Sequence, residues 1–243
     1  MESAYLRALS VFLKKFRHIL IYGAGGVTAD LLAFVGPYLP EHTCIVVTQK
    51  TEGREEMGGY PVKELAEFSS ACQEAYVLVS AAPRHVPQME AQLNRLGFTN
   101  YCRASKLVEE MCREIEAFPV DRYKIVFSNG DGYGFGGNPK YIALELRKRR
   151  PDLDLVWAIG EGGGGLPQGV RAVPYGTYAH YYELGTAGFW LDNQHKNFFT
   201  RKRKGQYYLQ TWHGGGPLKK IEFDAKGLPD SYLDLCERNA KMT

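Results

Sequence analysis

The sequence has few of the features that mark secreted, membrane-spanning or nucleic-acid-binding proteins. Its five cysteines are odd in number and show no CxxC spacing, which argues against a disulfide framework and against a structural zinc site. No apolar run approaches the roughly 18 residues that a membrane-spanning helix needs, and the opening stretch is amphipathic rather than continuously apolar like a signal peptide. The net charge of +3 is too small to indicate nucleic acid as a partner. We therefore expect a cytoplasmic protein with no bound metal and no nucleic acid.

Basic residues are present, but they are unevenly placed. The stretches RKRR at 147–150, RKRKG at 201–205 and KK at 219–220 all lie in the second half of the chain. Local basic patches attract phosphates or an anionic membrane surface, although a solvated surface is the simpler interpretation of any one of them. Peripheral contact with the inner face of the cell membrane therefore stays open as an alternative.

Strands and helices are expected to alternate along both halves of the chain. In the first half, apolar strands are predicted at HILIY, TCIVV and AYVLV, with helical spacing between them, including PVKELAEFSSA at 61–71. The second half repeats this layout, with strands at YKIVFSNG, DLDLVWAIG, VRAVP, GFWLDN and GQYYLQTWH. Such alternation predicts parallel, doubly wound sheets. The expected fold is α/β with two tandem Rossmann-like domains, residues 1–119 and 120–243, divided near Pro119.

The first predicted strand runs into a glycine-rich turn, GAGGVTA. Gly23, Gly25 and Gly26 would let a phosphate approach backbone N–H groups at a helix start, so this turn is a candidate nucleotide loop. A site for a nicotinamide dinucleotide also needs an acidic residue about 20 positions further on to hold the ribose. The second strand ends VVTQK, without such a residue. The stretches ILIYGAGGVTADLL, MGGYPVKELAEF and VLVSAAPRHVPQMEAQLNRLGF resemble the small Rossmann-like domains attached to sugar-modifying transferases. That resemblance implies a nucleotide- or sugar-sensing module, or a purely structural one.

A second set of motifs lies between Tyr123 and Asp224. In order, these are NPKYIALEL, GFWLDNQHKNFF, RKRKGQYYLQTWHG and PLKK. Together they resemble the CDP-glycerol glycerophosphotransferases, which build polyol phosphate polymers of the teichoic-acid type at the inner face of the bacterial membrane. The resemblance implies a glycosyltransferase-B-like pair of facing domains and a CDP-linked polyol phosphate donor. It also implies a hydroxyl acceptor on a glycan, a lipid-linked unit or a growing cell-wall or capsule polymer, and no cofactor is expected.

His213 is the candidate catalytic residue. Transfer of a phosphoryl group to an alcohol needs a base for the hydroxyl proton, and histidine titrates in the useful range. It also needs N–H donors and positive charge around the phosphate oxygens. The glycine run and lysines after the strand meet that need, and the family's pattern places its essential histidine in this WHG. The expected phosphate- or substrate-binding residues of this segment are Gly214, Gly215, Gly216, Lys219 and Lys220.

Two further stretches are expected at the same cleft. Asp192 and Asn193 end the strand GFWLDN, where the family's pattern has a polar pair, although an Asx-type turn at the strand end explains them equally well. Asn138 and Pro139 are expected as the N-cap and first turn of the next helix. The dipole of that helix would point toward the cleft and make Asn138 part of an anion or acceptor site.

After WHG the chain departs from the family's pattern, because Gly215 and Gly216 stand where the family usually has one threonine. The resemblance also implies a nucleotide-binding domain beyond the histidine motif, which would need about 150 further residues. Since the sequence stops at Thr243, we expect the acceptor-side half of a transferase that lacks its donor-binding domain. The alternative is a non-catalytic nucleotide-sugar-binding or scaffold module of a larger transferase.

Overall fold

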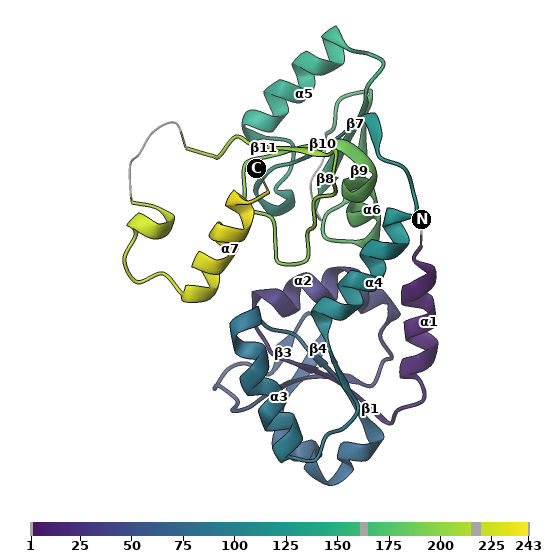
Figure 1. The fold of residues 1–243 in the computed structure, drawn as a ribbon, viewed down its shortest axis with the longest axis vertical. Coiled ribbons are helices and arrows are strands. Elements are labelled where there is room, and N and C mark those ends of the chain that lie inside the picture. The colour runs from purple at the N-terminus through teal and green to yellow at the C-terminus, as the bar shows by residue number, and fades with distance from the viewer. Residues whose placement is uncertain (1, 161–164, 215–219, 243) are drawn as a thin grey trace. The chain divides into compact units, whose positions relative to one another are not determined.

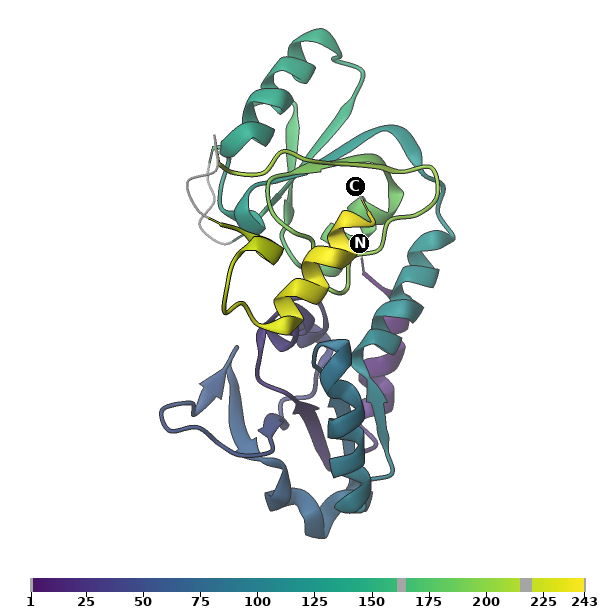
Figure 2. The ribbon, with the colours of Figure 1, turned by 60° about the vertical axis from the view of Figure 1, so that its left-hand side comes forward.

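The structure, a computed structural model, describes residues 2–160, 165–214 and 220–242. The chain separates into two compact units, residues 2–114 and 115–243, which are described one at a time (Figures 1 and 2). Each unit contains a sheet whose strands are mainly parallel, with helices in several of the connections between strands. The expected α/β class is therefore confirmed. Within the described ranges, none of the helices combines the length and apolar character needed to cross a membrane.

The first unit is built on a six-stranded sheet in the order β3-β4-β2-β1-β5-β6. All neighbouring strands run parallel except the short β3, which pairs antiparallel with β4. The strands are β1 His18–Tyr22, β2 Thr43–Val47, β3 Glu56–Met57, β4 Tyr60–Glu64, β5 Ala75–Val79 and β6 Tyr101–Arg103.

The helices of this unit connect its strands. They are α1 Ala4–Leu13, α2 Gly26–Val35, η1 Gly36–Tyr38, η2 Leu65–Glu74, η3 Pro83–His85, α3 Val86–Arg95 and α4 Ala104–Glu116. The expected helix at 61–71 is wrong in its first part, because those residues form β4. Val62 pairs with Ile45 of β2 and is 2% exposed, so pairing with the sheet overrides the helical spacing. Helical structure starts only at Leu65, after a capping box between Glu64 and Glu67.

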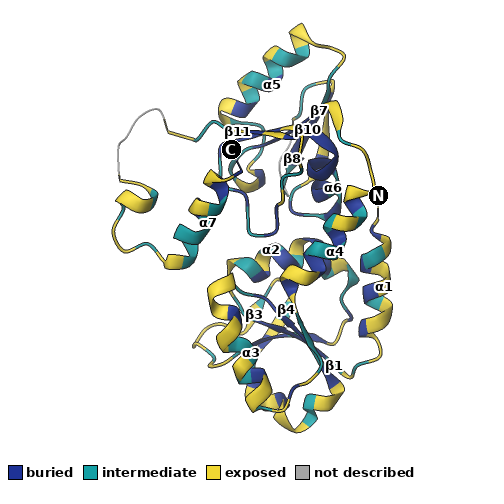
Figure 3. Cartoon of the chain, viewed as in Figure 1, coloured by how far each residue is buried: buried dark blue, intermediate teal, exposed yellow. Residues whose placement is uncertain are grey.

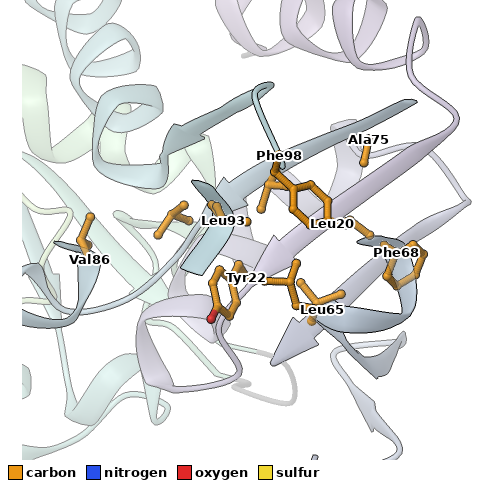
Figure 4. Packing of buried hydrophobic residues seen from close by; sticks show 11 residues of the cluster. Leu20, Tyr22, Leu65, Phe68, Ala75, Val86, Leu93 and Phe98 are labelled. Carbon is orange, nitrogen blue, oxygen red and sulfur yellow. The ribbon is translucent and has the colours of Figure 1, made fainter. Parts of the chain in front are cut away.

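Strands of both sheets are largely buried, as Figure 3 shows. In the first unit, Leu20 and Tyr22 of β1 pack with Leu93 of α3 and Phe98 on one face of the sheet (Figure 4). Burial on both faces explains why these strands are continuous apolar runs rather than alternating ones.

The second unit contains a five-stranded, wholly parallel sheet in the order β11-β10-β7-β8-β9. The strands are β7 Asp121–Ser128, β8 Asp154–Ile159, β9 Val170–Pro174, β10 Ala187–Asp192 and β11 Tyr207–Gln210, so all five predicted strands are confirmed. The first strand, β7, lies in the middle. The chain extends the sheet on one side of β7 and then returns to extend it on the other.

Helices cover both faces of this second sheet. The helices of this unit are η4 Gly130–Gly132, α5 Gly137–Arg149, α6 Tyr178–Thr186, η5 Glu222–Asp224 and α7 Asp230–Ala240. Ala143 of α5 packs with Phe127 and Trp157 on one face. Leu184 of α6 packs with Trp190 on the other, so α5 and α6 lie on opposite faces.

A buried ion network fastens α6 to the sheet. Lys124 of β7 bonds to the carboxylate of Glu183 at 2.8 Å, and Arg171 of β9 bonds to the same carboxylate at 2.6 Å. Burial alone would raise the pKa of Glu183, but its hydrogen bonds with Arg171 and Lys124 hold that pKa below the ordinary value. Arg171 also bonds to Asp154 at 2.8 Å, so three strands and one helix share the network.

Candidate active site

The site lies where the strand order of the second unit reverses. β8 pairs with one side of β7 and β10 with the other, so the connections that leave β7 and β10 run in opposite directions. Open α/β sheets bind their ligands in the crevice at the carboxyl ends of such strands. β7 ends at Ser128 and β10 at Asp192, and the residues that follow these two strands meet at this point.

Asp192 is a carboxylate at the end of β10 and is only 1% exposed. It forms an ion pair with the buried Lys196 and accepts a hydrogen bond from the Tyr208 hydroxyl at 2.9 Å. Burial, reinforced by the charge of Asp192, raises the pKa of Tyr208 above its ordinary value, so this hydroxyl keeps its proton and stays a donor. Lys196 also donates to the Ser128 hydroxyl at 3.3 Å. The charge of Asp192 is thus engaged within the protein.

Asn193 joins three segments and is 3% exposed. Its side-chain oxygen accepts from the Gly130 N–H at 2.9 Å, and its amide donates to Asn129 at 2.8 Å. Gly137 packs directly against this pair, since a Cβ there would lie 2.6 Å from Asn193 Nδ2 and 2.7 Å from Asn129 Oδ1. The start of α5 can therefore approach the end of β10 only because residue 137 has no side chain.

His213 follows β11 and turns back toward the end of β10. The Thr211 N–H donates to the Asp192 carbonyl at 2.8 Å, which continues the β10–β11 pairing past the strand end. His213 Nδ1 lies 2.9 Å from the Asn193 carbonyl oxygen. A carbonyl can only accept, so Nδ1 carries the hydrogen and, in the neutral ring, Nε2 carries the lone pair. The His213 side chain is exposed, and this tautomer suits a proton acceptor.

Trp212 holds the turn that redirects His213. Its φ of 57° lies in the left-handed region, which costs a bulky residue about 1–2 kcal/mol. Its ring stacks on the His213 imidazole with centroids 4.5 Å apart, and meets His195 edge-on at 5.5 Å. The strained backbone and the stacked ring together fix the direction of the imidazole.

The N-terminus of α5 lies beside the same turn. The Asn138 amide donates to the carbonyls of Thr211 at 3.4 Å and Trp212 at 3.5 Å. The prediction of Asn138 as the N-cap is wrong, because Gly136 occupies that position and makes no side-chain capping bond. Gly137 adopts φ 64° to start the helix, so the glycines permit an earlier start than the Asn-Pro pair suggested.

The other predicted residues of the histidine segment are only partly described. Gly214 and Lys220 are exposed. Gly215, Gly216 and Lys219 lie outside the described residues. Gly23, Gly25 and Gly26 belong to the first unit.

Sequence comparison assigns this unit to a family. The sequence model described as CDP-Glycerol:Poly(glycerophosphate) glycerophosphotransferase matches residues 111–241, more than half of the chain. The chain belongs to this family. The resemblance carried by the motifs from NPKYIALEL to PLKK is therefore confirmed.

The names of several curated relatives of this chain place those relatives in teichoic acid synthesis. A teichoic acid poly(glycerol phosphate) polymerase of Bacillus spizizenii is 29% identical over 133 residues, which cover 52% of this chain and 34% of the relative. A teichoic acid glycerol-phosphate transferase of Staphylococcus aureus is 32% identical over 103 residues, covering 41% and 26%. A polymerase of Staphylococcus epidermidis is 29% identical over 103 residues, covering 42% and 14%. The chain thus spans about a third or less of the curated relatives that it matches.

Solved structures show the same fold at low identity. The wall teichoic acid polymerase TagF superimposes with a TM-score of 0.50 and 23% identity over 65% of this chain and 38% of TagF. A TagF structure soaked with CDPG gives a TM-score of 0.51 and 22% identity, with the same coverage. At this identity the likeness supports the fold alone.

Sequence reasoning missed several residues of this family member's site. Lys196 is 4% exposed and pairs with Asp192, although its position in the polar run QHKN predicts a surface residue. His195 Nε2 lies 2.9 Å from Glu222 Oε1. A ring nitrogen of His195, a carboxylate oxygen of Glu222 and Cys236 Sγ all lie within 4.8 Å of one another.

A fully buried histidine lies beneath the site. His180 is 3% exposed, and burial together with the charge of Lys196 holds its pKa well below the ordinary 6.5. Its Nδ1 accepts the Gly176 N–H at 3.1 Å, while its Nε2 has no hydrogen-bond partner among the described residues. Burial and the nearby Asp131 raise the pKa of the neighbouring Tyr175 well above 10.0. Both groups are therefore neutral near physiological pH.

The second unit also contains an apolar cavity of about 1020 Å³, on the α5 side of β7, β10 and β11. Ile125, Leu191 and Tyr207 are among its lining residues. Neither His213 nor the residues that orient it contribute to this lining, so the cavity is separate from the candidate active site.

Proposed function

We propose that the second unit carries the acceptor side of a CDP-glycerol-type glycerophosphotransferase, with His213 as the catalytic base. The observation that carries this proposal is the 2.9 Å hydrogen bond between His213 Nδ1 and the Asn193 carbonyl. It leaves the Nε2 lone pair on an exposed ring, beside the carboxyl ends of β7 and β10. Family membership and the names of the relatives support the reaction class.

In this mechanism, His213 Nε2 accepts the proton of an acceptor hydroxyl as the hydroxyl oxygen attacks the phosphorus of a polyol phosphate. A P–O bond to the acceptor forms, and the phosphoanhydride P–O bond to CMP breaks. CMP leaves with the electron pair of that bond. The polyol phosphate becomes a phosphodiester of the acceptor, and the proton passes from His213 to solvent.

Positive electrostatic potential at the reacting phosphate comes from the N-terminus of α5 and from the segment after His213. A helix N-terminus attracts anions by roughly 0.3–1 kcal/mol, and the N-cap of α5 makes no side-chain bond that would compete with a ligand. Asn138 lies in this first turn and contacts the His213 loop. The proposed ligands on the segment itself are Gly214, Gly215, Gly216, Lys219 and Lys220.

Asp192 and Asn193 serve in this proposal as positioning residues. Both are buried and already bonded within the protein. Asp192 holds Lys196 and Tyr208, which keeps the end of β10 in register with β11, and Asn193 presents the carbonyl that orients His213. Their substitution should act through the geometry of His213 rather than through a lost substrate contact.

The finer assignments are part of the same proposal. The donor is a CDP-linked polyol such as CDP-glycerol, held by a facing domain of the glycosyltransferase-B type, and the acceptor is a glycan, lipid-linked unit or polymer end. Contact with the inner membrane face would rest on Lys202 and Lys204. The stretch 147–150 is less suited, since its side chains bond to Gln168, Glu145 and Asp152.

The test is release of CMP from CDP-glycerol in the presence of a glycerol phosphate-primed acceptor. We expect His213→Ala to lose about 10²–10⁴-fold in rate, the usual contribution of a general base. His42→Ala, an exposed histidine of the first unit, is the matched control and should turn over normally. Phosphorus NMR of the product would show the new phosphodiester.

Two outcomes would contradict this assignment. Normal turnover by His213→Ala would remove its role as the base. Nucleotide binding by the wild-type protein without any release of CMP would favour the scaffold module instead.

A further inference from the structure

The glycine loop of the first unit occupies a second reversal of strand order. β2 pairs with one side of β1 and β5 with the other, so the loop that leaves β1 lies at a second crevice of the kind that binds ligands in α/β sheets. The family match begins at residue 111, so it assigns no role to this loop.

The glycines of this loop have two different roles. Gly23 has φ 123°, and a Cβ there would lie 2.1 Å from the Ser80 carbonyl oxygen, so the packing of β1 on β5 requires it. Gly25 and Gly26 are different, because a Cβ at either would meet nothing within 4 Å. Gly25 is the N-cap of the ten-residue α2 and makes no side-chain capping bond. Open space therefore adjoins backbone N–H groups that α2 itself leaves without carbonyl partners.

A buried hydroxyl provides independent evidence for a ligand. Ser80 follows β5 and is 2% exposed, and its Oγ has no hydrogen-bond partner among the described residues. Val77 and Val79 pack on the α3 face of the sheet, so alternation directs the Ser80 side chain to the opposite face. On that face Thr28 of α2 donates to the Ser80 carbonyl at 3.3 Å. The unpartnered hydroxyl thus lies under the start of α2, and a buried polar group of this kind normally has a hydrogen-bond partner.

A cation is held against the same loop. Arg54 Nη1 donates to the Ala24 carbonyl at 2.9 Å, while the rest of this exposed guanidinium remains open to solvent. The nearby Glu55 carboxylate is paired with Lys50. Arginine presents several N–H donors in a plane that matches phosphate oxygens, so the loop combines backbone donors, a hydroxyl and a positive charge.

The residues after β2 argue against a nicotinamide dinucleotide as the ligand of this loop. The strand is followed by Thr48, Gln49 and Lys50, and the Thr48 hydroxyl is hydrogen-bonded to Tyr22. None of these three residues is the carboxylate with which a nicotinamide dinucleotide site holds the ribose diol. Phosphate groups can be bound here without that contact.

We propose that the loop 23–26, Ser80 and Arg54 form a binding site for the pyrophosphate of a nucleoside diphosphate or of its sugar ester. The site is built from residues of the first unit and does not depend on the proposed transfer reaction. Pyrophosphate oxygens accept from the first turn of α2 and from Ser80 Oγ, and Arg54 balances their charge.

The test is calorimetric titration of the full chain with CDP, UDP, GDP and ADP, with inorganic pyrophosphate and NAD alongside. At least one nucleoside diphosphate should bind, pyrophosphate should compete with it, and NAD should bind more weakly. Gly25→Asp should abolish this binding through charge repulsion and occupation of the helix N–H groups. Its Tm should stay equal or rise, because Asp is a favoured N-cap.

Control variants separate the site from general effects. Gly59→Asp adds the same charge at an open position of the β3–β4 turn and should bind as the wild type does. Ser80→Ala should lose about tenfold in affinity without loss of Tm, since it removes an unpartnered buried group. His213→Ala should retain this binding, since His213 belongs to the second unit.

The proposal is overturned if none of the nucleoside diphosphates binds at millimolar concentration. It is equally overturned if Gly25→Asp binds them with wild-type affinity while remaining folded.

Discussion

At the residue scale, the active-site geometry depends on a backbone atom. His213 is oriented by the Asn193 carbonyl, which cannot be removed by substitution and cannot take up a proton. Its position is instead set by the Asn193 side chain, whose amide is wedged between Asn129 and Gly137. The orientation of the His213 ring is therefore sensitive to packing several bonds away.

Gly137→Ala should disturb this packing without altering any polar group. The added Cβ would lie 2.6 Å from Asn193 Nδ2, and both amides involved are held by hydrogen bonds. Overpacking of this kind costs about 1–3 kcal/mol. We expect that loss in denaturant unfolding, together with a lower rate of CMP release.

Gly134→Ala is the matched control for this variant. Its φ of 58° is close to the 64° of Gly137, but a Cβ there meets nothing within 4 Å. Both variants carry the left-handed backbone penalty, so their difference measures the clash alone. Equal losses of stability would show that Asn193 is not wedged as described.

His180 should make stability depend on pH. The unfolded histidine takes up a proton below about 6.5, whereas the folded one, with its lowered pKa, stays neutral. The contribution of His180 is therefore complete above pH 6.5 and declines as the pH falls from there. The free energy of unfolding of the wild type should fall more steeply with acid than that of His180→Gln. Parallel slopes for the two proteins, with exposed His42→Gln as reference, would contradict this.

At the scale of elements, α6 is fixed by charge as well as by apolar packing. Glu183 of α6 forms ion pairs with Lys124 and Arg171. Both Lys124 and Glu183 are less than a tenth exposed. A buried ion pair need not stabilise a fold, but breaking one leaves an uncompensated charge.

Glu183→Gln should consequently destabilise the protein by about 3–5 kcal/mol, because it leaves Lys124 buried without its anion. The double variant Lys124→Met, Glu183→Leu should recover most of that loss in chemical denaturation. Glu145→Gln, which breaks an exposed pair with Arg149 on α5, should leave stability unchanged. A small loss for Glu183→Gln would mean that water reaches Lys124.

The predicted elements succeeded where local pattern and tertiary contacts agree. The strands β7, β8 and β10 contain apolar runs that are buried in the sheet, and His213 was singled out because a motif surrounds it. β4 was missed because its pairing with β2 outweighs a helical pattern around Pro61. Lys196 was missed because the polar run around it gives no indication that its side chain pairs with a buried carboxylate. A partner distant in sequence decided the first case, and burial of the strand end decided the second.

At the scale of the whole molecule, each unit has a core of its own. The first packs around β1 and β5, and the second around β7, β8 and β10. Helix α4 ends at Glu116, and its Glu114 accepts a hydrogen bond from the Ala4 N–H at 2.7 Å, which ties this helix to the start of the first unit.

Residues 1–116 should therefore fold without the rest of the chain. We expect a single cooperative thermal transition and dispersed amide signals in NMR, since a unit of this size can bury a sufficient core. The excised unit should also keep the nucleoside diphosphate site. A spectrum typical of a molten globule would show instead that the first unit needs the second for its packing.

Trp212 carries a consequence for protein engineering. Its left-handed backbone is unfavourable for an indole side chain, yet the same turn places its ring on His213. A library selected for heat resistance alone should enrich glycine or asparagine at this position, because both tolerate that conformation. The selected variants would survive heating but would lack the indole ring that stacks on His213. Position 212 is therefore one to hold constant when this protein is made more robust.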